Sequence, residues 1–303
     1  MNMSNTSNTS SESSHLTDYR RFFAEEIEAV AKLRTPALVE ALAAVPRERF
    51  LPPGPWTVLA GNDFMAADSL WTMTTPDSDP RRVYHNIVVA IDAARQLFNG
   101  QPSTLTAWID LLALVPGARV LHVGSGLGYY TALLAQSVGS SGRVVAYEVD
   151  ELLAAEARQN LAYMSWVEVR HGDASAAFAE TFDAILVNAG VTHPLEAWLD
   201  ALAAHGRMIV PLTSTMPAMG THIGKGLAWL LTNGDTGLAA RVIGLVSIYS
   251  ALGVRDDALN EKLGKAMMTG PGQWQAVTRL RRDPHEPSAS CWVHMPRCCL
   301  TRA

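Results

Sequence analysis

Short apolar runs alternate with amphipathic segments through the middle of the chain. The apolar runs predict strands, and the segments between them, whose apolar residues recur at helical spacing, predict helices. The strands are expected at 119–123, 143–148, 167–170, 183–188 and 207–210, and the helices at 129–138, 151–161 and 195–204. Repeated strand–helix units of this kind form a parallel sheet with helices on both faces.

The segments before this core follow other patterns. Residues 1–16 are rich in Ser, Asn and Thr with almost nothing apolar to bury, so a disordered tail is expected there. Two short helices are expected next, and the second begins at Thr35-Pro36, an N-cap followed by proline at the first helical position. A strand is predicted over 83–91, and a helix over 103–114.

The pattern changes again after the fifth core strand. Strand-like runs at 227–231 and 240–249 flank Asn233-Gly-Asp-Thr-Gly237, which predicts an antiparallel hairpin. Beyond it, a helix is expected over 255–268 and one more strand at 292–294. The sequence therefore predicts a mostly parallel sheet that finishes in an antiparallel hairpin.

Composition narrows the class of protein. The 303 residues suit one large α/β domain, or a core with a smaller added unit. The net charge is −5, and the basic excess typical of duplex-binding proteins is missing, so no nucleic-acid partner is expected. We see no secretory h-region and no apolar run of about 18 residues, so a cytoplasmic protein without a membrane span is expected.

The three cysteines all lie near the C-terminus, at 291, 298 and 299. They form no Cys-x-x-Cys pair, and we identify no histidine at a zinc-ligand spacing from them. Reduced structural thiols are therefore expected, since disulfides are rare in the cytoplasm, and no metal centre is predicted.

The strongest local signal is Val120-Leu-His-Val-Gly124-Ser125-Gly126-Leu-Gly128, where a strand runs through three glycines into a helix. Glycine allows the backbone to turn sharply and to approach a ligand closely. The helix N-terminus that follows presents free N–H groups and a partial positive charge. Such a loop holds an anionic or hydroxyl-bearing cofactor at the carboxyl edge of the sheet.

The glycine spacing separates two classes of cofactor. Dinucleotide loops read G-x-G-x-x-G, whereas this loop reads G-x-G-x-G and has Tyr129 where the dinucleotide pattern has its third glycine. No Lys or Arg stands between residues 120 and 141 to meet a phosphate. A cofactor that carries a carboxylate and a sulfonium but no phosphate fits this loop better than NAD.

Three further positions support a cofactor site. Glu148, followed by Val149, ends the second strand and is placed to accept hydrogen bonds from both hydroxyls of a ribose; the alternative is a solvated carboxylate at a strand end. Asp173, after Gly172, is placed to accept from an adenine amine, or else it caps the next helix. Asn188 ends the fourth strand and either contacts cofactor or acceptor, or serves as a turn residue.

Together these residues resemble the class I methyltransferases, and among them the protein-L-isoaspartate O-methyltransferase family. The resemblance covers residues from about Leu38 to Pro211. Outside the glycine loop it rests on Val45-Pro-Arg-Glu-Arg-Phe50, Gln101-Pro102, Pro116-Gly117-Ala-Arg-Val-Leu, Val169-Arg-His-Gly-Asp173, Phe182-Asp183-Ala-Ile-Leu-Val and Gly206-Arg-Met-Ile-Val-Pro211.

The resemblance implies a Rossmann-like α/β fold with a seven-stranded sheet, S-adenosylmethionine as cofactor, and methylation of a peptide or protein carboxylate. The implied organisation is a tail (1–16), a helical cap with the acceptor segment (17–110), the cofactor-binding core (111–250) and a C-terminal extension (251–303). Cofactor contacts are expected from Gly124, Ser125, Gly126, Gly128, Glu148, Val149, Gly172, Asp173 and Asn188.

One departure from the family concerns the acceptor. The family carries Thr-x-Ser-Gln-Pro before the helix that precedes the first core strand, and its serine helps to hold the substrate carboxylate. Here the stretch reads Phe98-Asn-Gly100-Gln101-Pro102, so Gly100 stands at the position of that serine. The loss of this hydroxyl and the extra C-terminal segment favour an alternative, O- or N-methylation of a small metabolite or biosynthetic intermediate.

Methyl transfer from a sulfonium requires alignment of acceptor, methyl and sulfur, and a carboxylate acceptor needs no general base. An alcohol or phenol acceptor would need one, for which His193 is the candidate, although a lone loop histidine is more often a surface residue. Asn188, Asp92 and Gln101 are the other candidate catalytic residues, and Tyr84, His85 and Asn86 could line the acceptor site. A third hypothesis is cofactor binding without catalysis. The oligomeric state is left open.

Overall fold

A ten-stranded sheet forms the centre of the computed structural model, which describes residues 6–59, 72–215 and 222–302 and their side chains from residue 16 onward. In spatial order its strands are β13 (Cys291–His294), β14 (Cys299–Arg302), β12 (Val277–Arg281), β11 (Gly237–Tyr249), β10 (Ile223–Gly234), β9 (Leu202–Ser214), β8 (Phe182–Val187), β5 (Arg119–Val123), β6 (Arg143–Glu148) and β7 (Val167–His171).

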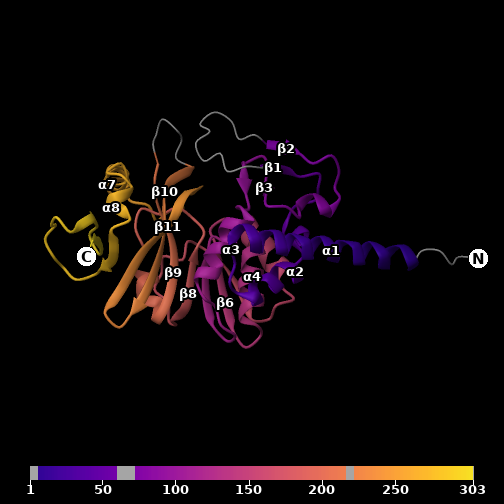
Figure 1. Ribbon diagram of the computed structural model, residues 1–303, viewed down its shortest axis with the longest axis horizontal. Coiled ribbons are helices and arrows are strands. Elements are labelled where there is room, and N and C mark those ends of the chain that lie inside the picture. The colour runs from indigo at the N-terminus through magenta and orange to yellow at the C-terminus, as the bar shows by residue number, and fades with distance from the viewer. Residues whose placement is uncertain (1–5, 60–71, 216–221, 303) are drawn as a thin grey trace, which may run out of the picture.

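The strand order divides the sheet into two halves. The strands from β9 to β7 are parallel neighbours, and they include β5, β6 and β8, which form the expected core. From β9 to β13 every neighbouring pair is antiparallel. Figure 1 shows the long β10–β11 hairpin in orange and the C-terminal strands in yellow beyond it.

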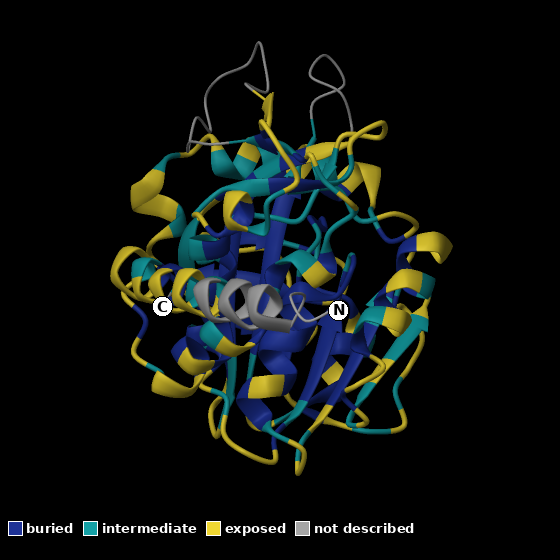
Figure 2. Ribbon diagram, turned by 90° about the vertical axis from the view of Figure 1, so that its right-hand side faces the viewer, coloured by how far each residue is buried: buried dark blue, intermediate teal, exposed yellow. Residues whose placement is uncertain are grey.

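Helices cover both faces of this sheet, as expected. On one face pack α1 (Thr6–Ala31), α2 (Pro36–Ala44), α3 (Pro102–Leu111), α4 (Tyr129–Val138) and α5 (Glu151–Leu161). On the other lie α6 (Glu196–Ala201) and α7 (Asp257–Met267), followed in the chain by the short α8 (Pro271–Trp274). Each face has its own apolar cluster, and the central strands between them are mostly buried (Figure 2). No helix in the described ranges is long and apolar enough to cross a bilayer.

A smaller sheet stands beside the glycine-loop end of the large one. Its order is β2 (Thr72–Thr74), β1 (Thr57–Leu59), β3 (Val88–Asp92) and β4 (Leu97–Phe98), and two short 3-10 helices, η1 (Arg47–Phe50) and η2 (Pro80–Val83), flank it. This sheet belongs to the segment expected to carry the acceptor site.

Three expectations require correction. The sheet has ten strands rather than seven and is mixed rather than mostly parallel, because residues 277–302 add three strands beyond the β10–β11 hairpin, which is therefore not terminal. The tail expected over 1–16 is helical from Thr6, where α1 begins; extending an existing helix is far easier than starting one, even through weak helix formers. Residues 1–5 lie outside the described part.

The strand predicted over 83–91 is also shorter than expected, because it begins only at Val88. The carbonyl oxygens of Val83, His85 and Ile87 accept hydrogen bonds from the guanidinium of Arg47, at 2.5, 2.9 and 2.6 Å. Arg47 is completely buried. Since these carbonyls are turned toward a side chain, they are not available to a strand partner.

His122 lies in β5 at the centre of the molecule. Its side chain is fully buried, its Nδ1 lies 2.8 Å from the Thr131 hydroxyl, and burial lowers its pKa to about 3. The folded chain therefore keeps this ring neutral in a range of pH where the unfolded chain takes up a proton.

We expect His122 to lower the stability of the fold as the pH is lowered from about 6.5 to about 3, because in that range the unfolded chain binds a proton that the folded chain does not. From pH 7 to pH 5 this one group should lower the free energy of unfolding by about 2 kcal/mol. Urea unfolding of His122→Gln should show a pH dependence smaller by about that amount, whereas His222→Gln, at an exposed position, should keep the wild-type dependence. Equal slopes for all three proteins would contradict this assignment.

Candidate cofactor site and family

The glycine loop joins β5 to α4 in a conformation that requires glycine. Gly124, Gly126 and Gly128 have positive φ values of 81°, 54° and 97°. A Cβ on Gly124 would lie 3.0 Å from the carbonyl oxygen of Asn188, and one on Gly128 would lie 2.8 Å from a methyl carbon of Leu161. Any larger residue here would adopt a strained backbone conformation and would also clash with neighbouring atoms. Glycine therefore allows the loop to pack closely against Asn188 and Leu161.

Glu148 fixes this loop to the end of β6. Its Oε2 accepts the Gly126 N–H at 2.7 Å, and its Oε1 accepts the Asp150 N–H at 3.1 Å. The carboxyl group is buried, and burial raises its pKa although the two N–H donors act against the increase. A carboxylate has about four lone-pair positions, so capacity remains for hydroxyl groups of a ligand.

The neighbouring strand ends bring the other nominated residues to the same edge. Gly172 donates its N–H to the Glu148 carbonyl at 2.9 Å, which places the loop after β7 beside Glu148. Val149 is exposed next to it. Asp173 accepts the Ser175 N–H at 3.0 Å, a contact within its own turn, and no helix follows it directly. An adenine contact for Asp173 stays a prediction.

Asn188 lies directly against the glycine loop. Its backbone N–H donates to the Val123 carbonyl at 2.8 Å, and its Nδ2 lies 3.4 Å from the Gly124 carbonyl oxygen. The hydroxyl of Ser125, in the same loop, is buried and has no hydrogen-bond partner among the described residues. An unpaired buried hydroxyl beside a glycine cradle and a carboxylate fits a polar ligand such as S-adenosylmethionine.

The segment expected to carry the acceptor site approaches this loop. Ile91 of β3 touches it, since a Cβ on Gly126 would lie 3.4 Å from its terminal methyl carbon. Asp92, a nominated catalytic residue, is paired with Arg95 at 2.6 Å, and Arg95 also pairs with Asp150, the N-cap of α5. Asp92 therefore helps to tie the β3–β4 turn to the cofactor-binding core.

The other nominated residues lie in varied surroundings. Half-buried His193 contacts Thr192, with Nδ1 and Oγ1 2.9 Å apart, and burial lowers its pKa. Gln101 is the N-cap of α3 and its side chain makes no capping hydrogen bond. Tyr84 is buried and donates its hydroxyl proton to Glu48, and Asn86 accepts the Ser103 N–H at 3.0 Å. His85 is exposed.

Three residues that the sequence did not single out hold this region together. Arg47 supports the backbone before β3, as described above. Tyr249 of β11 accepts the Phe98 N–H at 3.2 Å and donates to the Gln96 carbonyl at 2.5 Å. Arg255 donates to the Gly190 carbonyl at 2.7 Å. Tyr249 and Arg255 belong to no recognisable sequence motif, so the sequence alone does not indicate their role. Arg47 lies in the Val45–Phe50 motif that the chain shares with the family it resembles.

Glu148→Gln should weaken binding of S-adenosylmethionine by about ten- to a hundredfold, because hydrogen bonds to a charged acceptor contribute about 1.5–3 kcal/mol. Since burial raises the pKa of Glu148, wild-type affinity should also fall on acidification earlier than an ordinary glutamate would predict. Titration calorimetry measures both effects. Glu151→Gln, at an exposed carboxylate three residues later in the chain, at the start of α5, is the control and should bind as wild type.

Comparison with known proteins agrees with this geometry. The family model for protein-L-isoaspartate(D-aspartate) O-methyltransferase matches residues 74–225. A protein-L-isoaspartate O-methyltransferase of Methylorubrum populi is 32% identical over 241 residues, which cover 78% of this chain and 97% of the relative. One of Gloeobacter violaceus is 31% identical over 180 residues, which cover 58% and 74%.

Solved structures support the fold. A protein-L-isoaspartate O-methyltransferase aligns over 81% of this chain and 69% of its own with a TM-score of 0.59 and 23% identity. A putative one from Plasmodium falciparum, in complex with S-adenosyl-L-homocysteine, aligns over 77% and 97% with a TM-score of 0.57 and 17% identity. With the glycine loop, the Glu148 contact and these matches, the chain belongs to the protein-L-isoaspartate O-methyltransferase family, whose members are S-adenosylmethionine-dependent methyltransferases.

Proposed function

We propose that this enzyme transfers the methyl group of S-adenosylmethionine to a carboxylate oxygen of a peptide or protein. The observation that carries the proposal is that Asp92, a nominated catalytic residue, is held in an ion pair with Arg95 and is therefore a poor base for an acceptor proton. A carboxylate is ionised at neutral pH and needs no base, so it is the acceptor class best matched to such a site. The relatives named above carry the same type of activity in their names.

The chain's own residues would act by placement. The cofactor supplies an activated methyl group when it is bound. The glycine loop and Glu148 would hold its adenosine portion, while Asn188 and Ser125 offer polar groups beside the loop. The β3–β4 hairpin, anchored by Arg95 and Tyr249, would cover the site, position the acceptor and exclude water.

A second candidate acceptor is favoured by the loop before α3. Gly100 occupies the position of the family serine with φ of 77°, and its carbonyl accepts the Tyr130 hydroxyl at 3.0 Å. A Cβ there would lie 3.1 Å from a methyl carbon of Leu105. Because this loop is built around glycine, it offers no hydroxyl at that position. This favours an acceptor other than an isoaspartyl residue, such as a small metabolite or biosynthetic intermediate.

Labelled S-adenosylmethionine separates these candidates. With an isoaspartyl peptide and its aspartyl twin as acceptors, the proposal predicts label that mild alkali releases as methanol, the mark of a carboxyl ester. Alkali-stable label from a metabolite extract would instead support the second candidate. Normal cofactor binding with no turnover on peptides, proteins or extracts would contradict both and leave a binding protein.

Gly100→Ser should not install the family's substrate contact. A side chain at this positive φ costs about 1–3 kcal/mol, so the variant should melt at lower temperature and gain no isoaspartyl activity. Gly272→Ser is the control, because its φ is ordinary and a Cβ there would meet no atom within 4 Å. A rise in isoaspartyl methylation in Gly100→Ser would show that the loop accepts the serine after all.

A further inference from the structure

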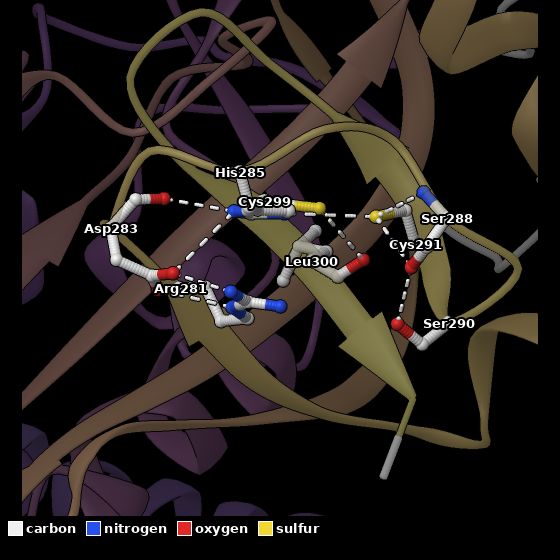
Figure 3. A network of polar contacts seen from close by, with 8 residues as sticks. All are labelled: Arg281, Asp283, His285, Ser288, Ser290, Cys291, Cys299 and Leu300. Atoms are coloured by element: carbon white, nitrogen blue, oxygen red, sulfur yellow. Dashed lines mark hydrogen bonds and ion pairs between the residues drawn. The ribbon is translucent and has the colours of Figure 1, made fainter.

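Four metal-binding side chains meet at the C-terminal edge of the sheet, outside the residues that match the family. They are His285, Cys291, His294 and Cys299, and their ligand atoms all lie within 4.8 Å of one another. We call this set the His–Cys cluster; Figure 3 shows three of its members, with Cys291, Cys299 and His285 directed toward a common point. Strand β13 is separated from β5 by six other strands, so the cluster lies about 30 Å from the glycine loop.

The backbone brings these residues together through a β-bulge. His294 of β13 stands directly opposite Cys299 of β14. Cys291 and His294 are three residues apart and would point to opposite faces of a regular strand. The register shifts between Cys291 and Val293, which is how a bulge re-aims a side chain and allows both residues to face one way. His285 completes the set from the loop before β13.

Contacts around the cluster orient the ligand atoms. The Nδ1 of His285 lies 2.8 Å from the Asp283 carbonyl oxygen, which makes Nδ1 the donor and leaves Nε2 free, 3.7 Å from the Cys291 sulfur. Metal-binding histidines commonly donate their second nitrogen in this way. The Ser288 N–H donates to the Cys291 sulfur at 3.3 Å, a contact that favours a thiolate.

An unpaired buried nitrogen points independently to a ligand. The Nδ1 of His294 is buried and has no hydrogen-bond partner in the part of the chain that the structure describes. The His294 and His285 rings stand nearly perpendicular, at 86°, with centroids 4.8 Å apart. Two imidazoles and two thiols at these distances cannot all be paired by hydrogen bonds to one another. A cation bound between them would interact with all four ligand atoms.

We propose that the His–Cys cluster binds one zinc ion with a structural role. Two sulfur and two nitrogen ligands around a common point are the donor set of tetrahedral zinc sites. Four protein ligands leave no open position, so the ion would act in folding rather than in methyl transfer. It would tie the loop before β13 to the β13–β14 hairpin, whose position in the sheet otherwise rests on short strands.

The absence of a Cys-x-x-Cys pair led the sequence interpretation away from a metal. The missed signal is Cys291-x-x-His294, the two-residue spacing with a histidine in place of the second cysteine. Cys298, directly beside Cys299, belongs to the apolar cluster under the sheet and not to the His–Cys cluster. It therefore offers a matched control for the effect of losing a cysteine.

The test uses the full chain, prepared under reducing conditions without an added histidine tag. Elemental analysis should find about one zinc per chain in the wild type and in Cys298→Ser. Cys291→Ser and Cys299→Ser should bind zinc at least about tenfold more weakly. Cobalt(II) in place of zinc should give the visible absorption of tetrahedral thiolate coordination in the wild type and lose it in both variants.

A measurement on the wild type guards against variants that fail to fold. A chelator should lower its melting temperature, and zinc, but not magnesium, should restore it. Reduced wild-type protein that neither contains zinc nor gives a thiolate spectrum with cobalt would overturn the proposal. So would a Cys291–Cys299 disulfide in freshly prepared protein, or a loss of metal in Cys298→Ser equal to that in Cys291→Ser. Each readout is independent of the methyl acceptor.

Discussion

The hydrogen bond between the Gly126 N–H and the buried Glu148 carboxyl group is the interaction on which the shape of the candidate cofactor site depends. It joins the loop after the first core strand, β5, to the end of the second, β6, which lies beside β5 in the sheet. A carboxylate inside protein must be hydrogen-bonded to remain charged, and two backbone N–H groups meet that need. These two contacts also fix the orientation of the carboxyl group, and its remaining lone pairs stay available to a ligand.

The segment expected to carry the acceptor site is held differently, by a few side chains that make long-range hydrogen bonds to backbone atoms. Arg47 lies about 200 residues before Tyr249 and Arg255 in the chain, and each of the three donates to carbonyl groups of segments around the site. Arg95 adds a charged link between the β3–β4 turn and the start of α5. The placement of this segment against the core therefore depends on a small number of side chains.

The sequence predicted the parallel core closely because local and global signals agree there. The strands at 119–123 and 143–148 and the helices at 129–138 and 151–161 have the predicted limits, since apolar periodicity, the glycine loop and the Asp150 cap coincide. The prediction failed where structure depends on distant partners. Strands β12 and β14 are short, show no regular alternation of polar and apolar residues, and pair with each other. Arg47 changes a strand pattern into an irregular segment, a choice invisible in residues 83–87 themselves.

In the candidate site the sequence identified groups but not their pairing. It placed Glu148, Asn188 and the glycines at one edge because strand ends in a parallel sheet must meet there. It could not show that Asp92 is held by Arg95, since that ion pair depends on how the β3–β4 turn folds back. The His–Cys cluster was missed for a related reason, because a bulge changes which side chains share a face.

The order of the last strands has a consequence for how the molecule assembles. Strand β13 precedes β14 in the chain, yet among the described strands it pairs only with β14, which in turn pairs with β12. During synthesis, therefore, β12 has one unpaired edge and β13 has no strand partner until β14 has been made. Exposed strand edges invite pairing with other chains. If β14 pairs slowly, this edge of the sheet is therefore where the incompletely folded chain would aggregate with other chains.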